Sequence, residues 1–392
     1  MGFQSGVMMI GLGLAGLGLA ACQVIEGDNN AILCPAELDV PCAARDRALS
    51  LVDIQTIGTH NSYKDHMPAP ELALLAAQSP RQAEALDYGH DTLTAQLDAG
   101  MRQLEIDILH DPVGGRFTDP MAPRLTQGQP GARAFDPAPL QAPGFKTLHV
   151  QDFDVWSRCA VFVTCLAEVR SWSVAHPDHA PILIMMNAKQ SPTGVPGSVD
   201  PLPFDAEAFR ALEAEILSVF AAEHVLMPDT VRGSAQTLRA GVLSQGWPSL
   251  DEMRGRVIFL LDENEAPLQP YLAGNPSLEG RVMFVKSVAE TAPHAAVFVL
   301  NNPERQFDEI QARVEAGYLV RTRADAGTRE ARTGDTARLE AALASGAHYI
   351  STDYYEPREE WSDYAASLPD GGVVRCNPVR QPAACAGGEM DR

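Results

Sequence analysis

The chain has 392 residues, of which 45% are hydrophobic, and its 30 basic residues against 51 acidic ones give a net charge of −21. The apolar fraction is too high for a disordered chain, and the length suits one barrel-sized domain or two smaller ones. The strong negative charge argues against nucleic acid as a partner and against electrostatic docking on an anionic membrane.

An uncharged apolar run over residues 7–21 has the length of a secretory leader rather than of a membrane-spanning helix. It ends in LAAC at residues 19–22, which resembles the processing site of bacterial lipoproteins. That resemblance implies a signal peptide over residues 1–21, lipidation of Cys22, and export to the outer membrane, periplasm or cell surface. The first six residues lack the Lys or Arg that signal peptides normally carry, so the alternative is an apolar helix packed on the domain.

The seven cysteines agree with export. With Cys22 set aside, the other six fall into three local pairs: Cys34 with Cys42, Cys159 with Cys165, and Cys376 with Cys385. Disulfides persist in oxidising compartments, whereas three pairs of reduced thiols would indicate a cytosolic protein. No pair has the spacing of a structural zinc site.

Residues 22–50 are predicted to form a disulfide-tied lead-in, residues 51–357 a single domain, and residues 358–392 an irregular tail. Helical stretches such as 205–220 and 336–344 separate short apolar runs that predict strands. The strand predictions are 54–59, 103–109, 146–150, 182–187, 257–261, 297–300, 319–323 and 349–352, with 282–285 as a ninth candidate. This alternation predicts an α/β fold with a parallel sheet, and eight units predict a (β/α)8 TIM-type barrel. An open doubly wound sheet is the alternative.

Polar residues gather near the ends of the first two predicted strands. His60 and Asn61 follow the first strand, and Glu105 and Asp107 alternate with apolar residues in the second. Because the apolar face meets the helices, both carboxylates are expected to point inward. Two buried carboxylates repel each other unless a cation is present. The oxygens of Asn61, Glu105 and Asp107 suit a hard ion such as Ca²⁺ or Mg²⁺.

The remaining strands add polar residues of other kinds. His149 lies in the predicted strand 146–150, and together with His60 it suits general acid–base chemistry. Arg321 and Arg323 share one face and suit a phosphate or a polyol. A purely structural reading pairs these arginines with aspartates, bridges the Glu-x-Asp pair with arginine, and packs the histidines in the core.

The order of motifs identifies a family. Residues 57–63, IGTHNSY, resemble the signature of the calcium-dependent bacterial phosphatidylinositol-specific phospholipases C. Similar continuations follow in order at 96–112, 170–184, 246–262, 317–332 and 342–357. The resemblance covers residues 51–357 and implies a barrel that cleaves an inositol phosphodiester to diacylglycerol and a cyclic inositol phosphate.

The resemblance also implies roles for individual residues. His60 would stabilise the phosphorane or take the hydroxyl proton of inositol, and His149 would protonate the leaving glycerol oxygen. Asn61, Glu105 and Asp107 match calcium-binding positions. The inositol ring would lie against the residues Arg321, Arg323, Asp353 and Tyr355.

One position departs from the family pattern. Asn187 stands where the family usually has a Glu that completes the metal site, while Lys189 keeps its family position in the substrate pocket. The loss of one carboxylate predicts weak calcium binding, because ligand charge is one of the factors that set calcium affinity. The alternative is that Lys189 supplies positive charge in place of a metal.

Two other functions remain as alternatives. One is a glycerophosphodiester phosphodiesterase, whose barrels have His-Arg-Gly at the first strand where this chain has His60-Asn61-Ser62. The other is a non-catalytic lipoprotein that binds a polyol or a lipid headgroup. The expected partners are an inositol phospholipid or related diester, and the membrane through the lipid anchor. No feature of the sequence sets an oligomeric state.

Overall fold

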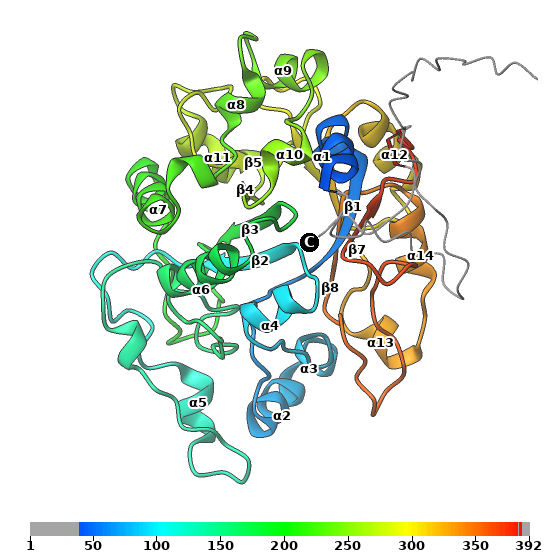
Figure 1. The fold of residues 1–392 in the computed structure, drawn as a ribbon. Coiled ribbons are helices and arrows are strands. Elements are labelled where there is room, and N and C mark those ends of the chain that lie inside the picture. Colours follow the sequence, from blue (N-terminus) through cyan, green and yellow to red (C-terminus); the bar gives the residue numbers. More distant parts are fainter. Residues whose placement is uncertain (1–38, 383, 386–392) are drawn as a thin grey trace, which may run out of the picture.

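The computed structural model describes residues 39–382 and 384–385 and shows an α/β fold in which helices surround a set of strands (Figure 1). The apolar leader, Cys22 and Cys34 lie outside the described residues, as does the side chain of Cys42. None of the helices in the described part has the length and apolar composition that crossing a membrane requires.

The described residues form nine strands, which make two sheets. The strands are β1 (Ile54–Thr59), β2 (Gln103–Ile108), β3 (Ile182–Ala188), β4 (Val257–Leu261), β5 (Phe284–Val285), β6 (Val297–Val299), β7 (Leu319–Arg323), β8 (Tyr349–Thr352) and β9 (Val374–Cys376). One sheet has the order β6-β7-β8-β1-β9 and the other β2-β3-β4-β5. All neighbouring strands are parallel except β9, which runs antiparallel to β1. The strands β3 and β4 are almost wholly apolar and buried, as expected for parallel strands covered on both faces.

The α/β prediction is confirmed, but a closed barrel is not seen among the described residues, because no ladder joins the two sheets. Between β1 and β2, the backbone N–H of Arg102 donates to Ile57 O at 2.9 Å, and that of Ser62 donates to Glu105 O at 2.8 Å. Between β5 and β6, a single bridge pairs Lys286 with Val297. The two sheets therefore meet at two seams held by isolated hydrogen bonds.

The predicted strand 146–150 is wrong, whereas the run 282–285 does contain a strand, β5. Lys146 forms only isolated antiparallel bridges with Leu109 and Val161. Its buried ammonium group donates to the backbone carbonyls of Ala142 and Gly144. Residues 146–150 therefore belong to the long connection between β2 and α6, and His149 is a loop residue.

Fourteen α-helices accompany the strands in the described part. They are α1 (Asp39–Ala48), α2 (Ala69–Gln78), α3 (Pro80–Leu86), α4 (Leu93–Asp98), α5 (Met121–Thr126), α6 (Phe162–Ala175), α7 (Ala206–Val219), α8 (Pro228–Arg232), α9 (Leu238–Ser244), α10 (Leu250–Met253), α11 (Glu265–Leu272), α12 (Phe307–Glu315), α13 (Arg329–Thr333) and α14 (Ala337–Ala344). Both predicted helices are present, as α7 and α14. The carboxylate of Asp205 caps α7 by accepting hydrogen bonds from the N–H groups of Glu207 and Ala208.

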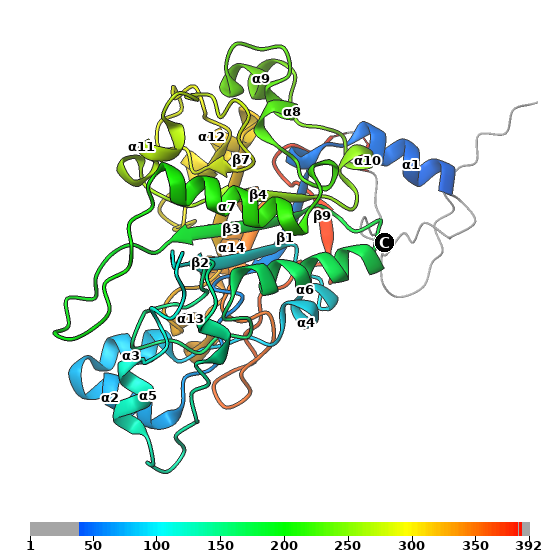
Figure 2. The same cartoon turned by 90° about the vertical axis from the view of Figure 1, so that its left-hand side faces the viewer.

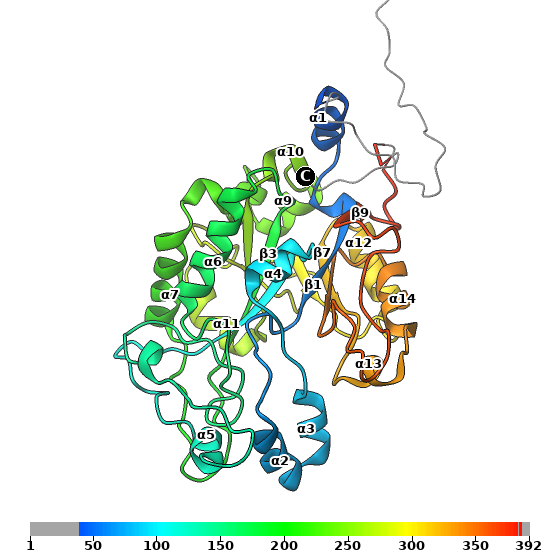
Figure 3. The same cartoon turned by 60° about the horizontal axis from the view of Figure 1, so that its bottom comes forward.

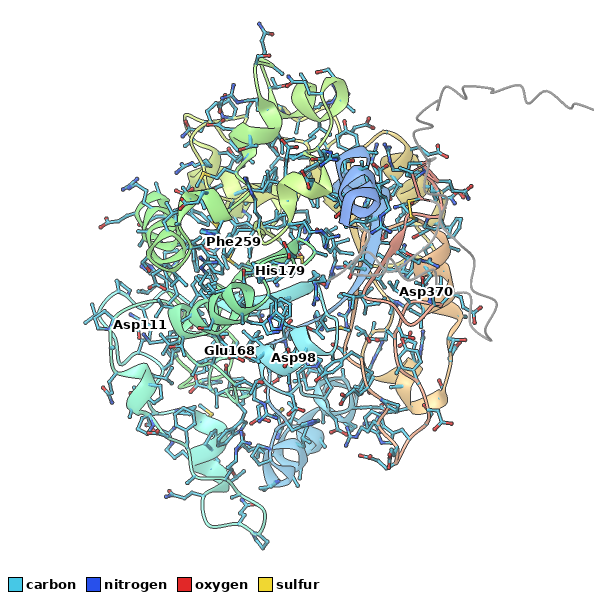
Figure 4. All side chains as sticks on the ribbon, viewed as in Figure 1. Asp98, Asp111, Glu168, His179, Phe259 and Asp370 are labelled. Atoms are coloured by element: carbon cyan, nitrogen blue, oxygen red, sulfur yellow. A yellow bond between two sulfur atoms is a disulfide. The ribbon has the colours of Figure 1, made fainter. Side chains whose placement is uncertain are left out.

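Side chains between neighbouring helices fix their packing. Figure 4 labels Asp98 of α4 and Glu168 of α6, two helices that pack against each other. Trp172 Nε1 donates to Asp98 Oδ1 at 2.6 Å, and the N–H of Thr94 donates to Glu168 Oε1 at 2.8 Å. Phe259 of β4 is fully buried in the core that the helices enclose.

The two ends of the strands differ in what covers them. Figure 2 shows the carboxyl end of β3 pointing toward the side that carries α2, α3 and α5, while α1, α10 and β9 lie on the opposite side. Figure 3 shows α2, α3 and α5 together beyond one end of the strands. Polar side chains at the carboxyl ends are therefore framed by the segments that follow β1 and β2.

Two of the three predicted disulfides are present, Cys159–Cys165 and Cys376–Cys385. The first lies at the start of α6, and the second begins in β9. The third predicted pair, Cys34 with Cys42, lies outside the residues whose side chains are described. The segment predicted as an irregular tail contributes β9, which pairs Val374–Cys376 with the start of β1.

Gly58→Ala is predicted to destabilise the seam between β1 and β2. A Cβ atom at Gly58 would lie 2.4 Å from both Cβ and O of Gln103, closer than any real contact. Forcing this overlap is expected to lower the free energy of unfolding by about 2 kcal/mol, measured by urea denaturation. In Gly372→Ala the new atom lies 3.5 Å from its nearest neighbour, so this control is expected to change little. Equal stability of the two variants would contradict the close approach of β1 and β2.

Candidate functional site

The predicted site residues converge at the carboxyl ends of the strands. His60 and Asn61 follow β1, and Asp353 follows β8, which pairs with β1 through Thr59 and Thr352. In the other sheet, Asp107 of β2 is in register with Asn187 of β3. The site therefore spans both sheets.

Glu105 lies at the centre of this arrangement and is only 4% exposed. Its Oε2 accepts a hydrogen bond from Arg321 Nη2 at 2.5 Å, which links β2 to β7 across the interior. Its Oε1 accepts from Asn187 Nδ2 at 3.0 Å and lies 3.7 Å from His60 Nε2. Arg321 also donates to the side chain of Asn301, a residue that the sequence analysis did not identify.

His60 is held by a carboxylate and a guanidinium group. Its Nδ1 lies 2.7 Å from Asp353 Oδ1, and Arg323 Nη1 lies 3.2 Å from its Nε2. Arg323 Nη2 also donates to Asp353 Oδ2 at 2.8 Å. Because guanidinium groups only donate, this geometry suits the neutral imidazole with its proton on Nδ1 and a lone pair on Nε2.

Two buried aspartates beside Arg323 have opposite electrostatic environments. Burial alone would raise the pKa of Asp353, but Arg323 and His60 outweigh it and hold this pKa well below its ordinary value of 3.8. Burial and the negative charge of Asp353 raise the pKa of Asp325 to about 7. Asp353 therefore carries the negative charge that balances Arg323, while Asp325 accepts hydrogen bonds from Thr352 and from the N–H of Asp353.

His149 has its own carboxylate partner, which sequence reasoning missed. His149 Nδ1 lies 2.8 Å from Asp154 Oδ2, because the turn over 150–154 brings the Asp154 carboxylate next to this nitrogen. Lys64 Nζ, fully buried, lies 3.4 Å from the same carboxylate. Burial would raise the pKa of Asp154, but Lys64 and His149 outweigh it and lower this pKa.

The two histidine groups are connected through Tyr88. Lys64 Nζ lies 4.7 Å from the centre of the Tyr88 ring, and the Tyr88 hydroxyl lies 3.3 Å from His60 Nδ1. Two short separations in the sequence could have pointed to these partners. Asp154 follows His149 by five residues, and Lys64 follows His60 by four. No periodic pattern marks them, because both partners act from loops.

Asp107 makes different contacts. Lys189 Nζ lies 3.1 Å from Asp107 Oδ2, and the Tyr63 hydroxyl donates to the same oxygen at 2.9 Å. Burial would lower the pKa of Lys189, but Asp107 and Glu105 outweigh it and raise this pKa. Lys189 is therefore a charged ammonium group in contact with Asp107.

Tyr355 lines a pocket of about 540 Å³. Asp353, His90, Arg158 and Arg358 also line this pocket. Its ring stacks on His90 with the ring centres 5.9 Å apart. Burial raises the pKa of Tyr355 to about 12, so its hydroxyl stays protonated at neutral pH. The predicted substrate residues Asp353 and Tyr355 thus line one pocket.

The donor set suits a hard cation. No group of three or more His, Cys, Asp or Glu side chains in the described residues is arranged to hold a metal ion. The candidate site instead combines the carboxylates of Glu105 and Asp107 with the amides of Asn61 and Asn187. Asn61 Nδ2 donates to the Tyr88 hydroxyl at 2.7 Å, which turns Oδ1 the other way. Carboxylate and amide oxygens are the ligands that calcium takes, so these residues fit the ion.

Comparisons with known proteins agree with this geometry. Residues 49–378 match the family described as phosphoinositide phospholipase C, Ca²⁺-dependent. No curated protein matches the chain significantly.

Solved structures similar to this chain include two phospholipases C, and the first of them supports the fold. A calcium-dependent phosphoinositol-specific phospholipase C from a Pseudomonas species, in a myoinositol complex, is similar with a TM-score of 0.53 and 14% identity, over 86% of this chain and 99% of that one. A Ca²⁺-dependent phosphatidylinositol-specific enzyme from Streptomyces antibioticus has a TM-score of 0.49 and 17% identity, over 79% of this chain and 96% of that one.

Asp353→Asn is predicted to flatten the acid dependence of stability. The pKa of Asp353 is lower in the folded protein than its ordinary value of 3.8, so its stabilising contribution is present above that pH and lost as the pH falls. At pH 7 the variant leaves Arg323 short of a buried counter-charge, which is expected to cost about 3 kcal/mol. Urea denaturation between pH 3 and pH 7, at about half-unit steps, measures both effects.

The control is Asp363→Asn, because Asp363 is exposed. This control is expected to keep the stability and the acid dependence of the unchanged protein. An Asp353→Asn variant with that same behaviour would show that Asp353 does not carry the balancing charge.

Proposed function

Because the chain belongs to the Ca²⁺-dependent phosphoinositide phospholipase C family, we propose that it cleaves an inositol phospholipid to diacylglycerol and a cyclic inositol phosphate. The protein is an enzyme of the phospholipase C type, and Ca²⁺ is the cofactor of its family. The observation that carries the proposal is the pair of histidines, each bound through Nδ1 to a buried aspartate, with His60 lying 3.7 Å from the buried Glu105. We also propose that the two sheets form a distorted (β/α)8 barrel with open seams.

His60 is the proposed base. With its Nδ1 proton on Asp353, its Nε2 lone pair can take the proton of the inositol 2-hydroxyl as that oxygen attacks phosphorus. Asp353 holds the ring and stabilises the imidazolium that forms, because it remains ionised at neutral pH. Arg323 contacts both groups and places positive charge beside the reacting phosphate.

His149 is the proposed acid. As the bond between phosphorus and the glycerol oxygen breaks, His149 gives a proton to that oxygen. Asp154 holds Nδ1, so Nε2 is the atom that transfers the proton. Lys64 helps to keep Asp154 ionised, so this carboxylate can hold the ring in position.

Asn61, Glu105, Asp107 and Asn187 are the residues that would hold calcium. The ion supplies Lewis-acid stabilisation of the charge that develops at the attacking oxygen and the phosphate. Arg321 and Tyr355 are proposed to contact the inositol ring of the substrate. Glu105 fixes Arg321, and Tyr355 lines the pocket beside Asp353.

The test of this proposal is an assay of the detergent-solubilised full chain on phosphatidylinositol vesicles, with calcium or with a chelator. The expected product is a cyclic inositol phosphate that forms only with calcium. Release of glycerol phosphate from deacylated substrate would favour a glycerophosphodiester phosphodiesterase instead. Headgroup binding without turnover would favour a non-catalytic lipoprotein.

His149→Ala is predicted to lower turnover at least ~10²-fold, because a general acid contributes on the order of 10²–10⁴-fold. Its melting temperature is expected to stay unchanged, because Asp154 keeps Lys64 as a partner. The control is His176→Ala, an exposed histidine just after α6, which is expected to keep full activity. A His149→Ala variant with near-native turnover would exclude His149 as the acid.

We further propose that Cys22 carries the lipid that attaches the exported chain to a membrane. Cys22→Ser is predicted to move the protein to the soluble fraction while its turnover of detergent-dispersed substrate is unchanged. A single acyl chain anchors only marginally, so firm attachment needs the several chains of a bacterial lipoprotein. Immunoblots of washed membranes measure the distribution. Continued membrane binding of the variant would indicate attachment by another part of the chain.

A further inference from the structure

The contact between Lys189 and Asp107 occupies part of the proposed calcium site. Lys189 Nζ lies 3.1 Å from Asp107 Oδ2, and the Asp107 side chain is only 3% exposed. The same oxygen accepts from the Tyr63 hydroxyl at 2.9 Å. An ion bound to Asp107 would therefore share this carboxylate with a cationic side chain.

The charges at the site already balance without an ion. Glu105 and Asp107 contribute two negative charges, and Arg321 and Lys189 contribute two positive charges in direct contact with them. Asn187 adds no charge, because its side chain is a neutral amide at a position where a carboxylate was expected. A divalent cation would create an excess of positive charge in a buried region, and the repulsion is strongest for the cation nearest to it.

Of the two cationic side chains, only Lys189 is free to move. Arg321 is 1% exposed and is fixed between Glu105 and Asn301. The side chain of Lys189 is 32% exposed and follows the last residue of β3 on a flexible aliphatic stem. Entry of the ion would therefore displace Lys189 and leave Arg321 in place.

A second carboxylate lies on the other side of Lys189. The strand β3 pairs with β2, which carries Asp107, and also with β4, which Glu263 follows two residues later. The N–H of Ala188, the residue before Lys189, donates to Glu263 Oε1 at 2.7 Å. The backbone next to Lys189 is thus bonded to Glu263 on the β4 side, whereas its ammonium group contacts Asp107 on the β2 side.

We propose that Lys189 and Ca²⁺ compete for Asp107, with the ammonium group moving toward Glu263 when the ion binds. This inference rests on the proposed function, because it concerns the same calcium site. Its consequence is that Lys189 sets the calcium concentration at which the site fills. The built-in cation keeps Asp107 balanced when calcium is scarce.

Calcium binding to the full chain, measured by titration calorimetry without substrate, tests this competition. Lys189→Met is expected to bind calcium roughly tenfold more tightly, the change that corresponds to one competing contact. Glu263→Gln is expected to weaken binding about threefold, because Lys189 loses its alternative partner. Lys286→Met is the matched control. Lys286 follows β5 and pairs with Asp262 at 2.9 Å, so the variant loses the same charge without freeing Asp107.

Melting temperatures give a second readout that does not depend on calorimetry. Without calcium, Lys189→Met is expected to melt below the unchanged protein, because Asp107 has lost its cation. Added calcium is then expected to raise its melting temperature more than that of the unchanged protein.

Calcium binding by Lys189→Met that equals or falls below that of the unchanged protein would overturn the competition. So would an equal gain in affinity in Lys286→Met, or the absence of calcium binding in every variant. If the unchanged enzyme cleaves phosphatidylinositol, any of these results refutes the competition alone. If it does not cleave phosphatidylinositol, the proposed function itself fails.

Discussion

The buried ion pair between Glu105 and Arg321 determines how the rest of the site is arranged. It joins β2 of one sheet to β7 of the other across an interior in which no ladder connects the sheets. The histidine group formed by His60, Arg323 and Asp353 belongs to the sheet that contains β1, β7 and β8. The candidate metal ligands of β2 and β3 belong to the other sheet. This side-chain contact and the hydrogen bonds at the seam between β1 and β2 therefore help to set the position of one group relative to the other.

Each of the two histidine groups is built in the same way, with a buried aspartate fixing a histidine and a cation fixing the aspartate. Arg323 plays this part for Asp353, and Lys64 plays it for Asp154. Both cations lower the pKa of their aspartate against the effect of burial, so the carboxylates stay charged and the imidazoles keep their orientation. Buried charges of this kind are tolerable only in pairs, and each of these two aspartates has a cationic partner.

Much of the fold followed from the sequence, because buried parallel strands are continuous apolar runs. Strands such as β3 and β4 are of this kind. The strand β5 has only two residues, which is why the run 282–285 stood out only as a ninth candidate. Residues 147–150 alternate polar and apolar side chains as a strand does. The sequence cannot show that Lys146 bonds local carbonyls instead of a neighbouring strand.

The candidate site was likewise predicted only in part from the sequence. Alternation along β2 and β7 placed Glu105, Asp107 and the two arginines on inward faces. Asp154, Tyr88 and Asn301 were missed because they reach the site from loops, where side-chain direction follows no period.

A buried ion pair such as Glu105–Arg321 is weak evidence for stability, because removing two charges from water costs about as much as their attraction returns. An apolar pair of similar volume could hold β2 and β7 together equally well. It could not fix the direction of Glu105, whose other oxygen accepts from Asn187 and faces His60. The value of the pair is therefore geometric. It orients a carboxylate that contacts both Asn187, one of the candidate metal ligands, and the His60 group, in a fold whose backbone hydrogen bonds leave the two sheets largely independent.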